Sequence, residues 1–230
     1  MKYTGRIISL VIVVISSLGL NVYNDIVNDY TDIMYLLVSA FFLFLGWRLG
    51  KQYDKVKYFS ERDLLTGSYN RRFIVDMFPK MKSISDRRAQ KLLIFLIDVE
   101  DFKLINDHYG HAMGDRVLQM IANALKKECG HLDYMVRWGG DEFVCIFPWT
   151  EVSGLNERYL ALHNVFNNLS TRISLNVSAS IGHAMYPDEG VELNELITIA
   201  DKNMYRDKRC RNNQDVKKLV SNGHLMKASL

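Results

Sequence analysis

Two stretches near the start of the chain, residues 7–24 and 33–47, are largely apolar and contain no charged residue. The first is long enough to cross a bilayer, whose apolar interior requires about 20 helical residues. The second reaches that length when it is extended from Tyr30 to Leu49, with its aromatic ends among the lipid headgroups. We therefore expect a hairpin of two membrane-spanning helices, over about residues 7–24 and 31–49.

Basic residues flank both stretches, whereas the loop between them has none and carries Asp25, Asp29 and Asp32. The flanking basic residues are Lys2, Arg6, Arg48, Lys51, Lys55 and Lys57. By the positive-inside rule, both ends of the hairpin then lie in the cytoplasm. We therefore expect a multi-pass protein of the cytoplasmic membrane, in contact with lipid, with both termini cytoplasmic. A cleaved signal peptide is the alternative for the first stretch, but it would leave the second unexplained.

Residues 51–62 connect this membrane region, residues 1–50, to the rest of the chain. Leu49 and Val56 lie a heptad apart, and Tyr53 lies between them. This spacing predicts a short helical stalk that pairs with the stalk of a second copy. A solvated linker helix is the alternative.

From residue 63 onward the pattern changes to shorter elements that alternate in type. The continuous apolar run 92–97 indicates a strand buried on both faces, and Val117, Leu118 and Ile121 share one face of a helix. The pattern predicts helices over 70–81 (interrupted at Pro79), 113–128, 155–169 and 193–207, and strands over 92–99, 134–147 (a hairpin), 173–184 and 216–220. The central βαββαβ order predicts an α+β domain over residues 63–230, with helices packed on a sheet that contains antiparallel strands.

The tip of the predicted hairpin combines Gly139 and Gly140 with Asp141 and Glu142. Adjacent glycines predict a tight primed turn with backbone at positive φ, and they leave room for a ligand to approach the backbone. Two carboxylates at an exposed corner suit Mg²⁺ that holds a nucleotide phosphate. A solvated turn with polar flanks is the alternative for this segment alone.

A second group of acids follows the buried strand that ends near residue 97. Asp98 and Glu100 point to one side of the extended chain, and Val99 points to the other. Open α/β sheets place ligand sites at the carboxyl ends of their strands. We therefore expect the acids of the two strand ends to converge on bound metal.

Four segments, residues 63–72, 98–115, 139–143 and 200–205, resemble successive blocks of the GGDEF family of diguanylate cyclases. The resemblance implies a palm-like βαββαβ fold of the nucleotide-cyclase type. It also implies an enzyme that condenses two GTP into cyclic di-GMP and two pyrophosphates across a homodimer interface, with Mg²⁺ or Mn²⁺ as cofactor and cyclic di-GMP receptors downstream. A catalytically inactive GGDEF domain that senses GTP or cyclic di-GMP is the alternative.

The resemblance also assigns the acids. Asp98 is the first metal carboxylate, assisted by the backbone carbonyl of Val99, and Glu142 is the metal ligand from the hairpin. Asp141 is the other essential acid, either as a metal ligand or as a base near the attacking 3′-hydroxyl. The division of these two roles between Asp141 and Glu142 stays open.

By the same resemblance, Asn106 and Asp115 recognise guanine. This chemistry fits, because a carboxylate can accept hydrogen bonds from both guanine N1–H and the N2 amino group. Phe102 is expected to pack rather than to contact substrate. The remaining substrate contacts implied by the family are the backbone at Gly139 and Gly140 and the phosphate-binding side chains Lys103, Lys208 and Arg211.

Two departures from the family pattern bear on the expected active site. Glu100 stands where a second aspartate is more usual, so the charge is kept on a side chain that is one methylene longer. After Lys208 the family's spaced Gly-Arg-Asn is shortened and lacks the glycine, and Arg211 is the arginine that we expect to meet phosphate.

Composition also indicates which partners and which cellular compartment suit the protein. The formal net charge of +3 is too small to favour a nucleic-acid partner. The three cysteines show neither a disulfide framework nor zinc-site spacing, which fits a reducing compartment.

Overall fold

A computed structural model of the chain describes residues 3–28, 33–130, 133–149 and 154–205. The chain divides into two compact units, Met1–Glu61 and Arg62–Leu230. The division falls at the end of a long helix, and each unit is described here by itself.

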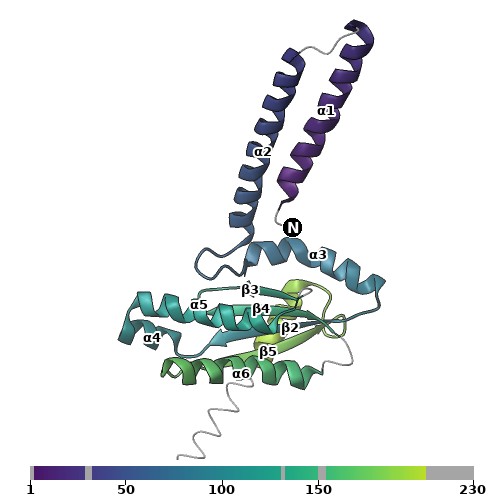
Figure 1. Ribbon diagram of the computed structural model, residues 1–230. Coiled ribbons are helices and arrows are strands. Elements are labelled where there is room, and N and C mark those ends of the chain that lie inside the picture. The colour runs from purple at the N-terminus through teal and green to yellow at the C-terminus, as the bar shows by residue number, and fades with distance from the viewer. Residues whose placement is uncertain (1–2, 29–32, 131–132, 150–153, 206–230) are drawn as a thin grey trace, which may run out of the picture. The chain divides into compact units, whose positions relative to one another are not determined.

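The N-terminal unit consists of two long helices that lie side by side (Figure 1). They are α1 (Thr4–Asn28) and α2 (Ile33–Glu61). Small residues allow the two helices to approach each other closely. Ser9 Oγ of α1 donates a hydrogen bond of 2.8 Å to the carbonyl of Gly46 of α2. A Cβ added to Gly50 would lie 2.7 Å from the Cα of Arg6. The backbones therefore meet at a distance that larger residues would prevent.

A polar contact joins the same two helices near the start of α1. Asp54 of α2 accepts hydrogen bonds from the backbone amides of Gly5 (2.7 Å) and Arg6 (3.4 Å). The Arg6 Nε also lies 3.4 Å from an Asp54 carboxylate oxygen. Because the first amides of a helix have no partner within it, Asp54 caps α1 from the neighbouring helix.

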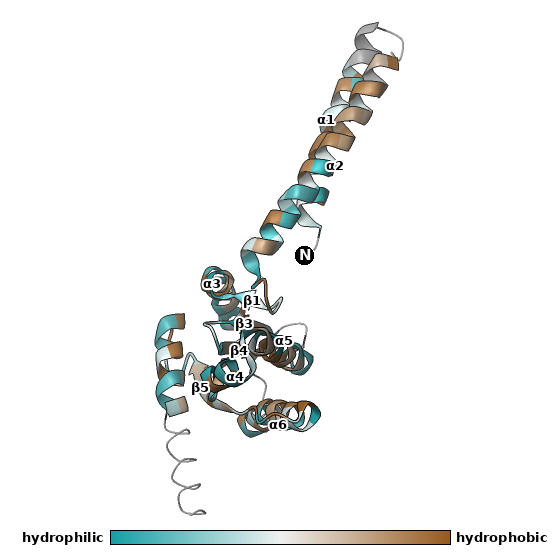
Figure 2. Ribbon diagram, turned by 90° about the vertical axis from the view of Figure 1, so that its left-hand side faces the viewer, coloured by the Kyte–Doolittle hydropathy of each residue, from teal (hydrophilic) through white to brown (hydrophobic). Residues whose placement is uncertain are grey.

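Hydrophobic residues make up much of the length of both helices of this unit (Figure 2). Ile7, Ile15 and Phe41 are each about 60% or more exposed. Within the described side chains, one helical stretch, Thr4–Tyr23, is long and apolar enough to cross a membrane. Both membrane spans therefore stay predictions. α2 runs without a break to Glu61, so the second predicted span and the predicted stalk belong to one helix.

The C-terminal unit is built on one mixed sheet. Its strands are β1 (Tyr69–Asn70), β2 (Leu92–Val99), β3 (Tyr134–Arg137), β4 (Glu142–Pro148) and β5 (Ala179–Tyr186). They lie in the order β1-β3-β4-β2-β5; β1 and β3 are parallel, and the other neighbours are antiparallel. β2 is buried along most of its length because it lies between β4 and β5 and both of its faces are covered.

Helices cover both faces of this sheet (Figure 1). The helices of this unit that have defined bounds are α3 (Arg71–Arg87), α4 (Phe102–Tyr109), α5 (His111–Glu128) and α6 (Leu155–Ile173); residues 193–205 are also helical. One apolar cluster joins Phe95 and Phe143 to α5 and α6, and the other joins Leu96 and Val144 to α3 and residues 193–205. Alternation along each strand thus sends successive side chains into two separate cores.

The predicted strand 92–99, the hairpin and the central βαββαβ order are confirmed. The predicted helices 113–128 and 155–169 lie within α5 and α6, and helix 193–207 is described as far as residue 205. β1 and α4 were not predicted. The predicted strand 216–220 lies outside the described residues, as do Lys208 and Arg211.

Two boundaries predicted from the sequence are wrong. α3 continues through Pro79 to Arg87. Pro79 and Val75, the residue whose carbonyl loses its donor, are both exposed to solvent, while Phe78 and Met81 bury the apolar face of the helix on either side of the proline.

The second wrong boundary concerns the strand predicted over 173–184. α6 extends to Ile173 and β5 begins only at Ala179. The connection between them is held by Ser170, whose hydroxyl bonds both the amide and the carbonyl of Val177. Residues 174–178 therefore form the connection from helix to strand, although their sequence has a strand-like pattern.

Candidate active site

The two predicted acid clusters meet at neighbouring strand ends. Asp98 of β2 lies directly opposite Glu142 of β4 in the antiparallel register. The amide of Val99 donates to the carbonyl of Asp141 at 3.2 Å, which ties the end of β2 to the hairpin loop. Alternation places Asp98 and Glu142 on the face of the sheet that α3 and residues 193–205 cover.

This concentration of acids perturbs Glu142. Burial raises the pKa of its carboxyl above the ordinary value, and the charges of Asp98, Asp141 and Asp201 raise it further, with partial opposition from Arg71. Asp201 and Arg71 were given no role from the sequence. Both lie within segments that carry the family resemblance, and that was the one signal available.

The donor set is suited to a hard divalent cation. In the described part of the chain, no three acidic, histidine or cysteine side chains form a ready-made metal cage. Mg²⁺ characteristically binds through one or two carboxylates and completes its shell with water and substrate phosphates. A cation beside Asp98 and Glu142 would also relieve the repulsion that raises the pKa of Glu142. The residues present therefore fit such an ion.

The hairpin loop differs from the predicted primed turn. β3 ends at Arg137 and β4 begins at Glu142, and neither Gly139 nor Gly140 has a positive φ. The amides of Trp138 and Gly139 both donate to the carbonyl of Glu142, at 2.9 and 3.3 Å. The loop is therefore longer than a two-residue turn, and left-handed backbone is not required there.

The two glycines nevertheless differ in their surroundings. A Cβ added to Gly139 would lie 2.5 Å from the carboxylate oxygen Oε2 of Glu142, whereas a Cβ on Gly140 would meet nothing within 4 Å. Gly139 thus leaves the space that the Glu142 carboxylate occupies. Gly140 leaves open space at the tip.

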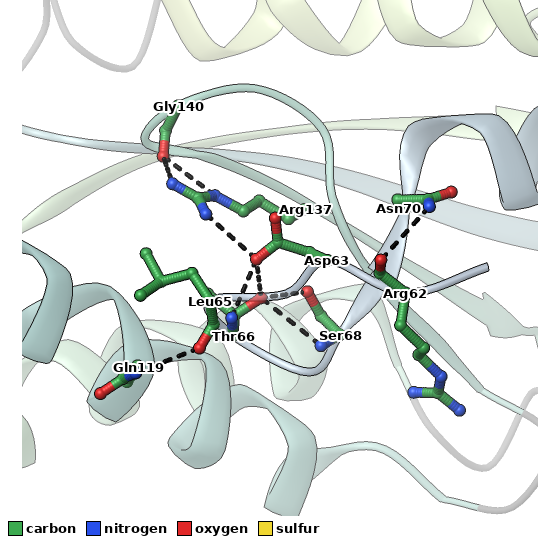
Figure 3. Close-up of polar contacts among 9 residues, drawn as sticks. All are labelled: Arg62, Asp63, Leu65, Thr66, Ser68, Asn70, Gln119, Arg137 and Gly140. Atoms are coloured by element: carbon green, nitrogen blue, oxygen red, sulfur yellow. Dashed lines mark hydrogen bonds and ion pairs between the residues drawn. The ribbon is translucent and has the colours of Figure 1, made fainter. Parts of the chain in front are cut away.

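Arg137 fixes this loop to the beginning of the C-terminal unit (Figure 3). Its Nε and Nη2 donate to the carbonyl of Gly140 at 3.1 and 2.7 Å, and its Nη1 donates to Asp63 at 3.0 Å. Asp63 also accepts from the amide and the hydroxyl of Thr66, at 2.9 and 2.7 Å. Burial alone would raise the pKa of Asp63, but the bonds from Thr66 and Arg137 outweigh it and hold the pKa below its ordinary value.

A cavity of about 400 Å³ lies beside the hairpin loop, against α4 and α5. Its lining residues are Phe102, Lys103, Asn106, Asp107, His111, Asp115, Leu118, Arg137, Gly140 and Asp141. Most of the substrate-contact residues expected from the sequence therefore border one cavity, whose volume is in the range of small-molecule sites.

The break between α4 and α5 shapes this cavity. Gly110 separates the two helices with a φ of 80°, a backbone conformation that favours glycine. Gly114 is buried, and a Cβ there would lie 2.0 Å from Asn106 Oδ1. Asn106 and Phe102 can therefore pack against the start of α5, near Asp115.

The site thus has two parts on either side of the hairpin loop. Asp98 and Glu142 lie toward α3, and the cavity with Asn106 and Asp115 lies toward α4 and α5. Asp141 belongs to both, because it borders the cavity and its carbonyl binds the end of β2. A nucleotide that crosses the tip could place its base in the cavity and its phosphates beside the acids.

Fold and site together define a palm-like α+β domain with a nucleotide-sized cavity next to paired carboxylates. Residues 60–214 match the family model described as the diguanylate cyclase GGDEF domain. The chain therefore belongs to the GGDEF family of diguanylate cyclases.

Known proteins agree with this assignment. The chain is 34% identical over 154 residues to diguanylate cyclase DosC of Escherichia coli, covering 64% of this chain and 33% of DosC. It is 33% identical over 162 residues to response regulator PleD of Caulobacter vibrioides, covering 68% of this chain and 36% of PleD. The chain thus spans about a third of the curated relatives it matches. The cyclic di-GMP phosphodiesterase NbdA of Pseudomonas aeruginosa is also similar, at 26% identity over 172 residues.

Solved structures share the fold. Diguanylate cyclase SiaD of Pseudomonas aeruginosa, in complex with its activator SiaC, matches with a TM-score of 0.60 and 30% identity, over 71% of this chain and 66% of SiaD. The coiled coil and GGDEF domain of DgcB from Caulobacter crescentus match with a TM-score of 0.63 at 24% identity, over 70% of this chain and 87% of that one. The second likeness concerns the fold alone.

Proposed function

We propose that this protein is a membrane-anchored diguanylate cyclase that condenses two GTP into cyclic di-GMP and releases two pyrophosphates. The observation that carries the proposal is the register pair Asp98–Glu142 beside the cavity that Asn106, Asp115 and Asp141 border. Family membership alone would not suffice, since a phosphodiesterase is among the proteins with a similar segment.

In this proposal, Asn106 and Asp115 bind the guanine edge from the cavity wall, and Phe102 packs behind them. Lys103 lies at the same wall and neutralises phosphate. Gly139 and Gly140 let the nucleotide lie against the backbone of the loop. Lys208 and Arg211, outside the described residues, supply further positive charge to the phosphates.

Asp98, Glu142 and the Val99 carbonyl would hold Mg²⁺ or Mn²⁺, with Asp141 as a further ligand or as the base near the 3′-hydroxyl. When bound, such an ion neutralises phosphate charge and stabilises the attacking and leaving oxygens of an in-line transfer. The protein's own contribution is positioning: the strand register sets the spacing of the acids, and the loop contacts of Arg137 hold the tip.

One domain holds one GTP, so a second domain must present the other for each bond to form. We propose that α2 supplies the contact between two copies through the exposed residues Leu49, Tyr53, Val56 and Phe59, which are all at least half exposed. A tether of this kind raises the effective concentration of the two domains toward the millimolar range, about what short linkers give.

We further propose that α1 and the first part of α2 span the cytoplasmic membrane, with both termini in the cytoplasm. Two observations support this arrangement. Both helices expose apolar side chains, as membrane-spanning helices do. Asp54 lies beside the start of α1, so the basic flanks of the hairpin lie at the same end. A reporter active only in the cytoplasm should work after Leu230, and one active only outside should work near Asp29. The reverse pattern would refute the topology.

The deciding experiment incubates the purified full chain with GTP and Mg²⁺ and separates the products by chromatography. Asp98→Asn and Glu142→Gln should each reduce cyclic di-GMP formation more than tenfold, about 1.4 kcal/mol of barrier, with the fold retained. Asp188→Asn, which removes a surface charge that pairs with Lys91, is the matched control. A wild-type chain that binds GTP and forms no product would instead support the sensor alternative.

A further inference from the structure

The carboxylate of Glu100 is bound by a pair of serine hydroxyls. Its carboxylate accepts from Ser178 Oγ at 2.7 Å and from Ser180 Oγ at 2.6 Å, one serine on each oxygen. Ser180 is fully buried. The backbone amide of Glu100 also donates to the carbonyl of Ser178 at 2.9 Å. We call this group the Glu100–serine clasp.

The clasp lies where the metal ligands are expected. In the pairing of β2 with β5, Asp98 is opposite Ser180 and Val99 is opposite Ala179, and Glu100 is the next residue along. On the other side, Val99 donates to the Asp141 carbonyl. The last residues of β2 are therefore anchored to the hairpin by Val99 and to β5 by the clasp.

Both oxygens of the Glu100 carboxylate take part in this group. Each carboxylate oxygen accepts a hydrogen bond from a serine hydroxyl, so part of its capacity to accept hydrogen bonds is already used within the protein. The two bonds hold the Glu100 carboxylate against Ser178 and Ser180, at the start of β5.

We propose that Glu100 is a positioning residue, which holds Asp98 and the Val99 carbonyl in place for the metal by binding Ser178 and Ser180. The proposal rests on the function proposed above, because that function assigns the metal to these ligands. Groups that orient metal ligands typically change metal affinity by about 10- to 100-fold when they are removed.

Side-chain length is part of this assignment. An aspartate at position 100 would keep the charge, but its carboxylate would sit one methylene closer to the backbone and could not reach both hydroxyls without moving the strand end. The longer side chain and the serine pair therefore form one unit. Replacing Glu100 by the residue that is more usual in the family should impair the site rather than restore it.

The test measures binding of a fluorescent GTP analogue to the full chain at a series of Mg²⁺ concentrations and without Mg²⁺. Glu100→Asp is expected to raise the half-saturating Mg²⁺ concentration about tenfold. Its affinity for the analogue without Mg²⁺ should stay within about twofold of wild type, because the cavity residues are unchanged. A purely structural role would lower the unfolding temperature and leave the Mg²⁺ requirement unaltered.

Ser178→Ala and Ser180→Ala, which remove only a hydroxyl, should raise the Mg²⁺ requirement in the same direction. Ser180→Ala should have less effect in the Glu100→Asp background than in wild type, because the two residues act together. Glu195→Asp is the matched control, since that carboxylate binds the amides of Val191 and Glu192 elsewhere in the domain.

The outcomes separate the two proposals. An unchanged Mg²⁺ requirement in Glu100→Asp and in both serine variants would overturn the positioning role; if Glu100→Asp does not fold, the serine variants decide alone. A wild-type chain that binds the analogue with Mg²⁺ and makes no cyclic di-GMP would refute the cyclase proposal and leave this test intact.

Discussion

Glu142 shows how a residue suited to a metal site can destabilise the chain that carries it. Burial and the neighbouring charges of Asp98, Asp141 and Asp201 raise the pKa of its carboxyl. A carboxyl whose pKa is raised in the folded state makes its full contribution to the stability of the fold at pH values below its ordinary pKa of 4.5. That stability is lost as pH rises through the raised pKa, because ionisation is then less favourable in the folded chain than in the unfolded one.

We therefore predict that Glu142→Gln raises the unfolding temperature at pH 7 without divalent cations. The rise should be small, roughly 1–2 °C, because solvent screens a partly exposed side chain. Thermal unfolding at pH 7 and pH 4 measures it, and the difference should shrink at pH 4, where the wild-type carboxyl is largely protonated. A variant that is less stable than wild type at pH 7 would contradict the repulsion.

Asp63 behaves in the opposite sense. Its pKa is lowered, because the bonds from Thr66 and Arg137 outweigh the effect of burial. Its contribution to stability is therefore present at pH values above its ordinary pKa of 3.8, and it is lost as pH falls through the lowered pKa. Asp63→Asn should lower the free energy of unfolding by about 1–2 kcal/mol at pH 7, with a smaller effect at low pH.

Urea unfolding followed by tryptophan fluorescence in a Trp47→Phe background tests this prediction, because Trp138 and Trp149 lie in the C-terminal unit. Arg137→Lys is a useful companion, since it keeps the charge and loses the planar fork that reaches both Asp63 and Gly140. Equal stability of Asp63→Asn and wild type at pH 7 would show that the contact is incidental.

At this scale, the sequence allowed the acids at the strand ends and the cavity residues Asn106 and Asp115 to be predicted, because the family blocks contain them. It did not indicate Asp201 beside Glu142 or the serines that bind Glu100. These neighbours come from segments about 60 to 80 residues away along the chain and meet only through packing of the sheet and its helices.

Among the elements, the hairpin loop gives a direct comparison of two glycines. Since neither has a positive φ, alanine is compatible with the backbone at both positions. Gly140→Ala is predicted to raise the free energy of unfolding by about 0.4–1 kcal/mol, because it restricts only the unfolded chain. Gly139→Ala should show no such gain and should reduce cyclic di-GMP formation at least about tenfold, because its Cβ displaces the Glu142 carboxylate.

Urea unfolding and the product assay on both variants measure these effects. Equal gains in stability at the two positions would mean that the Glu142 carboxylate moves aside without loss.

The two N-terminal helices offer a second prediction at this scale. Gly50→Val would press against the backbone of Arg6, and Asp54→Ala would remove the acceptor of the Gly5 and Arg6 amides. Either change should accelerate hydrogen exchange at the start of α1 by roughly 2- to 30-fold, the equivalent of losing a cap of about 0.5–2 kcal/mol. Exchange of the peptide that contains these amides, measured by mass spectrometry on the full chain, tests it.

Gly19→Val provides the control, because a Cβ at Gly19 meets nothing within 4 Å. If Gly50→Val and Gly19→Val exchange alike, the close approach of α1 and α2 does not protect the cap.

The elements most readily predicted from the sequence were those with a simple period. β2 is apolar throughout because it is buried on both faces, and α5 presents its apolar residues at helical spacing. The failures occur where a local signal was outweighed by packing. Pro79 should end a helix but lies on a solvated side, and residues 173–178 turn a corner held by Ser170.

For the whole molecule, the division after Glu61 bears on the proposed pairing of two catalytic domains. Both apolar clusters of the C-terminal unit are formed by residues beyond this point. We predict that removal of residues 1–60 leaves a folded domain that binds GTP, because its cores stay intact. Its specific activity should rise steeply with protein concentration, since two domains must then meet by diffusion.

Initial rates over a wide range of protein concentrations provide the measurement. A parallel dimeric coiled coil fused in place of the deleted residues should restore activity at low concentration, in at least some helical registers. Full specific activity of the truncated domain at nanomolar concentration, independent of dilution, would count against the stalk.

The uninterrupted course of α2 has a consequence for how the protein tolerates changes in length. Each residue of an α-helix turns the chain by about 100° and advances it by about 1.5 Å. One residue inserted between Lys51 and Glu61 therefore turns the rest of the helix by more than a quarter turn, whereas seven residues return it to within about 20°. We therefore expect insertions of near-whole helical turns in this part of α2 to preserve activity better than insertions of other lengths.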